Sequence, residues 1–443
     1  MKTISRFIGL FIACIGFTLS LMMPISPSIA DTLTLDINDV SFLWPIPTTQ
    51  QDVARLISVG EETLTGGKIW PQQVFDSVIN QAQTVKVSNN TIDFGRTFAP
   101  QIQQIDTWKV VGVRVDPCAP GTDKAINQVF GCAPQIRVVA QPVTVSAAGP
   151  KIHDLTAHLV FRYLQGVDTP AIPNGPPKAI PDERKFREIV NDLKILKADL
   201  QLAGIETNGN LSIHPGLKAK QAKFESSLKQ FLQKHLSEQQ LGGVAFMGLD
   251  GTEEPWIFFA MSRQPDGTFV QQAFPTLGGQ NAQMITGTSF GQRIIPTPTP
   301  TNIDRNQGVS TAMLLGPTTT ARLGNSVVQG SPTPQLQDIP DIIANPQKSH
   351  FFNTDCVSCH TESVFRSRLT KSKNGAFSYK LPTNISSVDP SLLPKSGWNV
   401  RSFGWFPPAS PTRKAIPSIS MRTANEAAES VEFINHKYLG ESD

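Results

Sequence analysis

The chain has 443 residues, with 39 Lys and Arg against 36 Asp and Glu, and a formal net charge of +3. This near balance excludes the strong positive bias of proteins that bind nucleic acids or other polyanions. Pro (35) and Gly (32) are frequent and charged residues make up 17%, which indicates a loop-rich globular protein. The length is sufficient for two or three domains.

The first thirty residues have the layout of a secretory signal peptide. Lys2 and Arg6 are positive, 7–23 is almost entirely apolar, and Ser28-Ile29-Ala30 supplies small residues before a cleavage site. We therefore expect residues 1–30 to be removed and the protein to be exported, to the periplasm or outside the cell. An alternative is that 7–23 stays in the membrane as an anchor. After residue 30, no stretch of the sequence is long and apolar enough to span a bilayer.

The sequence from 31 to about 164 mixes helix and strand patterns. A helix is predicted over 72–85, where Val74, Phe75, Val78, Ile79 and Ala82 share one face. Runs of β-branched and aromatic residues at 108–115, 135–145 and 158–164 predict strands. These patterns favour a mixed domain with a mostly antiparallel sheet.

Helices follow the proline-rich loop expected at 168–181. Pro181 suits the first position of a helix whose apolar residues recur up to Leu200, and Gly204 suits its left-handed C-terminal cap. A second helix is expected over 217–236. Strands at 244–249 and 256–261, followed by 268–274, then predict a β-meander.

The expected fold class is α+β, with a small and mostly helical unit at the C-terminus. The expected organisation is a signal peptide (1–30), an α+β region of unknown function (31–290), a Pro/Thr/Gly-rich linker (291–337) and a C-terminal unit (338–443). An alternative is that 31–290 consists of two subdomains that divide near 166–181.

Cys118 and Cys132 are predicted to form a disulfide. Each precedes Ala-Pro, they bracket a short loop, and no nearby histidine would complete a metal site. An exported chain favours such pairing, and closing a loop of about 15 residues is worth roughly 3 kcal/mol.

Cys356-Val357-Ser358-Cys359-His360 is the most specific motif in the sequence. Two thiols at i and i+3 on a helical turn can reach the two vinyl groups on one edge of a haem, and the next residue can place an imidazole under the iron. The motif predicts one covalently attached haem c, with His360 as the proximal ligand. The alternatives are a redox-active Cys356–Cys359 disulfide, for which the βαβ context is lacking, and a zinc site, for which a fourth ligand is lacking.

The C-terminal quarter, from about 337 to 443, resembles a class I c-type cytochrome. The resemblance rests on the haem-binding motif, a short helical approach at 339–349, and Met421 before a last helix. It implies that Met421 is the distal iron ligand; the residue-based alternative is a core methionine. His436 is a second candidate for the distal position, whereas His350 is too near the motif.

Further residues of this region also fit that resemblance. Thr423 and Glu426 are expected to form a capping box at the start of the last helix. An aromatic and basic cluster could surround a haem, or could be an ordinary core, and comprises Trp398, Arg401, Phe403, Trp405 and Phe406. The remaining histidines, His153, His158, His214 and His235, are scattered and show no metal-ligand spacing.

These observations predict an exported single-haem cytochrome that transfers electrons to an unidentified redox partner protein. No nucleic acid partner is expected. Two alternatives remain at this stage: a haem enzyme or sensor with an open iron position, and a non-haem interaction protein with a Cys356–Cys359 disulfide. No triad, phosphate loop or paired-carboxylate motif assigns a reaction to residues 31–290.

Overall fold

The structure is a computed structural model, and it describes the chain in several ranges. These are 33–87, 90–93, 98–170, 177–248, 256–273, 281–288, 291–294, 321–323, parts of 341–366, 388–394, 399–407 and 414–440. The predicted signal peptide, Trp398 and most of the predicted linker lie outside them. In the described ranges, no helix has the length and apolar character required to cross a membrane.

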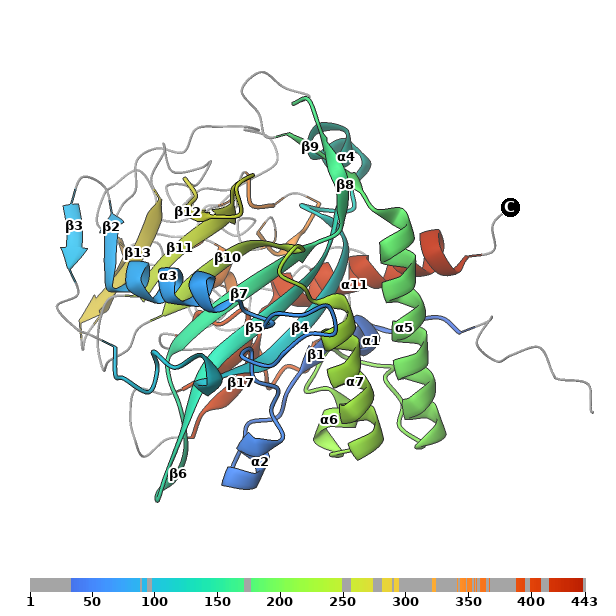
Figure 1. The fold of residues 1–443 in the computed structure, drawn as a ribbon, viewed down its shortest axis with the longest axis horizontal. Coiled ribbons are helices and arrows are strands. Elements are labelled where there is room, and N and C mark those ends of the chain that lie inside the picture. Colours follow the sequence, from blue (N-terminus) through green and yellow to red (C-terminus); the bar gives the residue numbers. More distant parts are fainter. Residues whose placement is uncertain are drawn as a thin grey trace, which may run out of the picture.

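A large antiparallel sheet organises the molecule, as the sequence predicts (Figure 1). The strands follow the order β1-β4-β5-β7-β10-β11-β13-β14-β15, while β6 pairs with β5 and β12 with β11. Their bounds are β1 Ser41–Leu43, β4 Trp108–Ala119, β5 Ala133–Ser146, β6 Gly149–Ile152, β7 Leu155–Arg162, β10 Leu241–Gly248, β11 Trp256–Arg263, β12 Phe269–Gln271, β13 Ala282–Thr288, β14 Gly291–Ile294 and β15 Ala321–Leu323.

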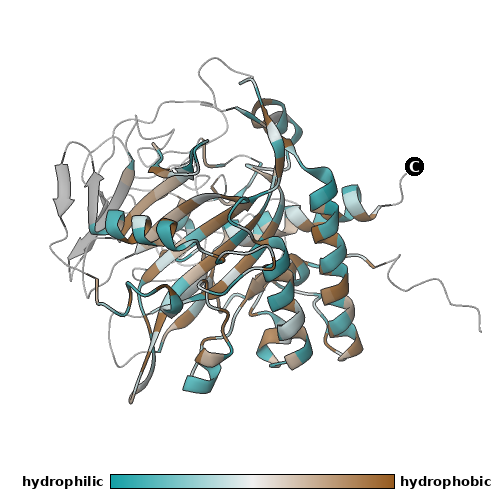
Figure 2. Cartoon of the chain, viewed as in Figure 1, coloured by the Kyte–Doolittle hydropathy of each residue, from teal (hydrophilic) through white to brown (hydrophobic). Residues whose placement is uncertain are grey.

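Helices cover one face of the sheet. They include α3 Gln72–Gln83, α5 Glu183–Leu202 and α7 Ala222–His235, and smaller helices are α1 Ile37–Val40, α2 Gln50–Ala54, α4 Lys124–Phe130, α6 Pro215–Lys218 and the 3₁₀ turn η2 Ile105–Thr107. Phe75 of α3 packs against Trp108, whose ring lies 6.3 Å from that of Phe246 on β10. In Figure 2 the strands are largely hydrophobic, whereas α5 and α7 carry hydrophobic bands on otherwise hydrophilic helices.

The predicted helix faces are confirmed, but three boundaries are corrected. Helix α3 ends at Gln83 instead of at 85, because Thr84–Val87 forms strand β2. The five apolar residues predicted to share a face of α3 are all buried, and so are those of α5. Pro181 does not begin α5: it ends strand β9 (Lys178–Pro181), and Asp182 caps the helix by accepting a hydrogen bond from the Lys185 N–H. The single helix predicted over 217–236 is two, α6 and α7, because the chain turns at Lys220, which has φ +53°.

The predicted meander is confirmed as β10, β11 and β12, and further short hairpins flank the sheet. They are β2 Thr84–Val87 with β3 Asn90–Asp93, β8 Leu164–Asp168 with β9, and β16 Phe403–Phe406 with β17 Ile416–Ile419. Gly204 has φ +70°, the left-handed conformation predicted for the end of α5. Strands β14 and β15 come from the segment for which the sequence predicts a linker.

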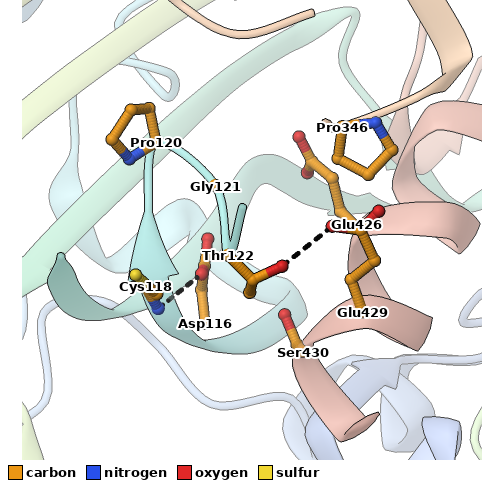
Figure 3. A pocket seen from close by; sticks show the side chains of 9 residues that line it. All are labelled: Asp116, Cys118, Pro120, Gly121, Thr122, Pro346, Glu426, Glu429 and Ser430. Atoms are coloured by element: carbon orange, nitrogen blue, oxygen red, sulfur yellow. Dashed lines mark hydrogen bonds between the residues drawn. The ribbon is translucent and has the colours of Figure 1, made fainter. Parts of the chain in front are cut away.

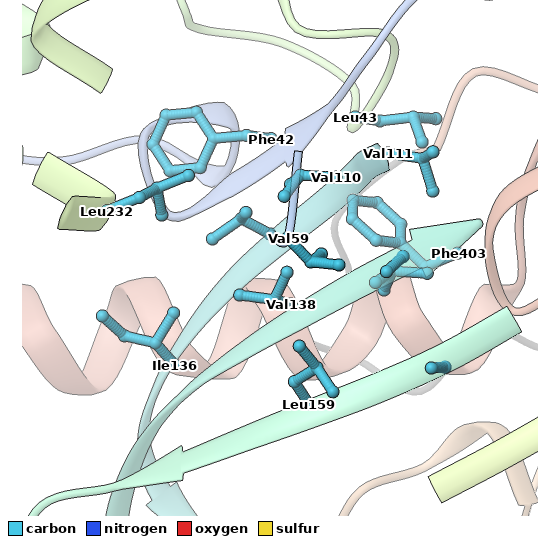
Figure 4. Packing of buried hydrophobic residues seen from close by; sticks show 14 of the residues in the cluster. Phe42, Leu43, Val59, Val110, Val111, Ile136, Val138, Leu159, Leu232 and Phe403 are labelled. Carbon is cyan, nitrogen blue, oxygen red and sulfur yellow. The ribbon is translucent and has the colours of Figure 1, made fainter. Parts of the chain in front are cut away.

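C-terminal elements lie on the sheet face opposite α3. Helix α11 (Met421–Ile434), continued by a π-helical turn (η4, Asn435–Leu439), lies behind the sheet in Figure 1 and contacts β4. Phe403 of β16 approaches β4 so closely that a Cβ on Gly112 would stand 2.7 Å from its ring. Figure 4 shows Phe403 beside the β4 and β5 side chains of a hydrophobic cluster that is continuous through the molecule.

The capping box predicted for α11 is wrong. Ser420 is the N-cap, and its hydroxyl accepts a hydrogen bond from the Thr423 N–H. The helix therefore begins earlier than predicted, and Met421 is its first residue instead of lying in a preceding loop. Glu426 turns toward arginines of the helix and the sheet instead of Thr423.

Candidate functional site

The Cys-x-x-Cys-His motif lies against the sheet face opposite α3. Cys356, Cys359 and His360 are helical and half-buried. Cys356 packs against Ala260 of β11, which is directly paired with Ala245 of β10. The small side chains of these two alanines let the motif approach the sheet closely.

The imidazole of His360 is held through one nitrogen. Its Nδ1 lies 2.9 Å from the carbonyl oxygen of Val400, and the Ser402 hydroxyl is 3.1 Å away. A carbonyl only accepts, so Nδ1 carries the proton and Nε2 keeps its lone pair. Burial lowers the pKa of His360 to about 4, and the ring is therefore neutral at pH 7. This is the arrangement in which metal-ligating histidines occur, with the second nitrogen fixed by a backbone carbonyl.

A row of paired residues on the sheet lies beneath the motif. Val139 of β5 pairs with His158 of β7, His158 with Ala245 of β10, and Ala245 with Ala260 of β11. Directly paired residues of antiparallel strands point to the same face. His158 therefore shares the face on which Cys356 packs.

Two rings of this face approach His360. The Phe258 ring centre lies 5.2 Å from that of His360, and the His158 ring centre 6.5 Å from it with an interplanar angle of 83°. Burial, reinforced by the nearby His360 and arginines, lowers the pKa of His158 to about 3. Sequence spacing could not indicate His158, because only the pairing of β7 with β10 brings it to the motif.

A cluster of charged groups borders the same face. Arg114 and Arg137 are directly paired on β4 and β5; both contact Asp116, and Arg114 forms an ion pair with Glu426 of α11. Burial opposes ionisation of Glu426, but the surrounding guanidinium groups outweigh it and hold its pKa well below the usual range. Nε of Arg114 is buried and has no hydrogen-bond partner in the described ranges.

Arg401 comes from the aromatic and basic cluster predicted from the sequence and is almost fully buried. Its guanidinium donates to Asp154 at 2.5 Å and to the Thr156 hydroxyl. Trp405 and Phe403 belong to the common hydrophobic core. Arg401 thus ties the segment that holds His360 to the start of β7, two residues before His158.

The backbone of Met421 is bonded to the helical segment that carries the motif. Its backbone N–H donates to the hydroxyl of Ser363, 3.1 Å away and three residues after His360 on the same helical segment. Its side chain is 6% exposed and belongs to the hydrophobic core. Of the other candidates, His436 is exposed and His350 packs against Phe130 of α4.

The predicted disulfide between Cys118 and Cys132 is present. It joins the end of β4 to the start of β5 across α4, where Ala119 and Ala133 are paired. A small pocket lies between this turn and α11 (Figure 3), and its lining residues are Asp116, Cys118, Pro120, Gly121, Thr122, Pro346, Glu426, Glu429 and Ser430. The Thr122 hydroxyl donates to Glu429 across it at 3.0 Å.

The residues of the site fit a haem c in their donor chemistry. The motif supplies two thiols and one neutral imidazole, and the buried Nε of Arg114 is a donor suited to a propionate. Comparison of the chain with protein-family models, with curated proteins and with solved structures finds no match.

Proposed function

We propose that this chain is an exported c-type cytochrome in which one haem is attached through Cys356 and Cys359, with His360 as an iron ligand. The observation that carries the proposal is the hydrogen bond from Nδ1 of His360 to the Val400 carbonyl. It leaves Nε2 as the coordinating atom, one residue after two thiols with the spacing of a haem attachment site.

When bound, the haem would supply a one-electron couple between ferric and ferrous iron. The chain's own residues perform the remaining tasks. The Val400 carbonyl orients His360 and increases its basicity, Ala260 packs against Cys356 from the side of the sheet, and Arg114 offers a donor to a propionate. These roles support electron exchange between the haem and a redox partner protein.

Covalent attachment is tested on the full chain, exported from cells that contain a haem-attachment system. We expect one haem per chain by mass, and colour that remains with the protein after denaturation and acid–acetone extraction. Loss of all colour from the correctly exported wild-type protein would contradict the proposal.

Two cysteine variants separate attachment from folding. Cys359→Ala should abolish normal two-bond attachment, because one thioether is lost. Cys118→Ala removes only the disulfide, so attachment should persist while the free energy of unfolding falls by about 3 kcal/mol in the chain-entropy model. If haem attachment were lost in Cys118→Ala and normal in Cys359→Ala, the motif would be excluded as the haem site.

A further inference from the structure

Four buried histidines have evident structural partners. His153 lies 2.9 Å from the Thr144 hydroxyl, His214 accepts from the Gly216 N–H, His235 contacts Asp192 at 2.6 Å, and His350 accepts from the Phe352 N–H. His158 differs from them, because no hydrogen-bonding partner for its ring is found within the described ranges. In the middle of β7, its ring faces that of His360.

The distance between His158 and His360 matches two imidazoles on one metal. Metal–imidazole bonds are about 2 Å long and each ring centre lies about 1 Å behind its nitrogen, so two ligands on opposite sides of one iron have centres about 6 Å apart. The observed separation is 6.5 Å. An interplanar angle of 83° is compatible with this arrangement, since each ring can rotate about the axis through the iron.

Both histidines are positioned by contacts of the surrounding backbone. His158 is in a central strand whose register is fixed on both sides, by Val139 and by Ala245. His360 is fixed by Val400, and the adjacent Arg401 is anchored by Asp154 and Thr156 at the start of β7. These contacts set the spacing between the two rings, as a pair of axial ligands requires.

We propose that His158 is the second axial ligand of the haem iron, opposite His360. The inference rests on the proposed haem attachment and names the residue that completes it. Met421, which the resemblance to class I cytochromes implies for this position, is tied through its backbone to Ser363 on the segment that carries His360. Two imidazoles also lead to a lower reduction potential than a histidine with a methionine, because a thioether favours ferrous iron.

The test uses the holoprotein and three matched Leu variants, each examined by visible and electron paramagnetic resonance spectroscopy and by carbon monoxide binding. The wild type should be low-spin, without the far-red charge-transfer band of an iron–thioether bond. His158→Leu should keep its covalent haem, become high-spin and bind carbon monoxide rapidly. Met421→Leu and His153→Leu should retain the wild-type spectrum.

A second pair of variants distinguishes the loss of an iron ligand from a disturbance of folding caused by the leucine. His158→Gly should bind added imidazole and recover the low-spin spectrum, and His158→Met should acquire the thioether band and a higher reduction potential. A wild-type spectrum in His158→Leu, or spectral loss in Met421→Leu instead, would overturn the inference while covalent haem remains. Absence of covalent haem from the wild type would instead refute the proposed function.

Discussion

At the scale of single residues, Gln141 is the side chain that joins the C-terminal segment to the sheet. It is fully buried on β5; its Nε2 donates to the Trp405 carbonyl at 2.9 Å, and its Oε1 accepts from the Trp405 N–H at 2.7 Å. One amide therefore satisfies both backbone groups of Trp405. Buried backbone groups that lose such partners are costly.

We expect Gln141→Leu to lower the free energy of unfolding by about 2–6 kcal/mol, because two buried backbone groups lose their partners at about 1–3 kcal/mol each. Urea denaturation followed by fluorescence measures the change. The control is Gln72→Leu at the exposed start of α3, where a change of under about 0.5 kcal/mol is expected. Equal midpoints for the two variants would show that the Gln141 amide does not hold the segment.

Residue chemistry that is local in sequence could be predicted, and chemistry between distant residues could not. The Cys118–Cys132 disulfide closes a short loop, so its partners are evident from the sequence. His158 and His360 are 202 residues apart in the sequence and meet only through the pairing of β5, β7 and β10. The spacing of residues in the sequence does not predict that contact.

At the scale of elements, α11 was predicted as a helix but with the wrong first turn. Ser420 and Thr423 are both suitable N-cap residues, and the sequence pattern did not distinguish them. Ser420 is the N-cap in the structure. Glu426 forms ion pairs with Arg114 of β4 and with Arg422, so its carboxylate is not available for a capping box with Thr423. Apolar periodicity predicts helix faces well, whereas boundaries depend on such tertiary contacts.

Glu429 of α11 should make stability depend on pH. Burial raises its pKa from 4.5 to about 7, despite the hydrogen bond from Thr122. Below pH 4.5 the carboxyl is protonated in both the folded and unfolded states. Between pH 4.5 and 7 only the unfolded state ionises, so this group's contribution to stability is lost as the pH rises through that range.

We therefore expect Glu429→Gln to gain stability relative to the wild type on going from pH 5 to pH 8, by up to a few kcal/mol. Chemical denaturation of both proteins at the two pH values gives this difference, and other titrating groups cancel in the comparison. Glu432→Gln, at an exposed position of the same helix, should change the free energy of unfolding by under about 0.5 kcal/mol at either pH. A constant difference for Glu429→Gln would refute the prediction.

At the scale of the whole molecule, the α+β class and the antiparallel sheet followed from strand and helix periodicities. The way the C-terminal segment packs did not. Phe403, Trp405, Ile419 and Met421 bury their side chains in the same continuous cluster as the strands of the sheet. Their apolar pattern indicates only that they are buried, and it does not say whether they form a core of their own or share one.

The shared core predicts that residues 338–443 depend on the rest of the chain to fold. Trp405 is fully buried, its indole donates to the Trp44 carbonyl at 2.8 Å, and its backbone is bonded to Gln141. Separation from the sheet would expose this ring and leave Arg401 without Asp154. We expect a fragment of residues 338–443, made with the haem-attachment system, to lack near-ultraviolet circular dichroism and a cooperative thermal transition, whereas the full chain shows both. A fragment that unfolds cooperatively and carries a low-spin haem would show instead that the C-terminal unit folds alone, and would also exclude His158 as its second ligand.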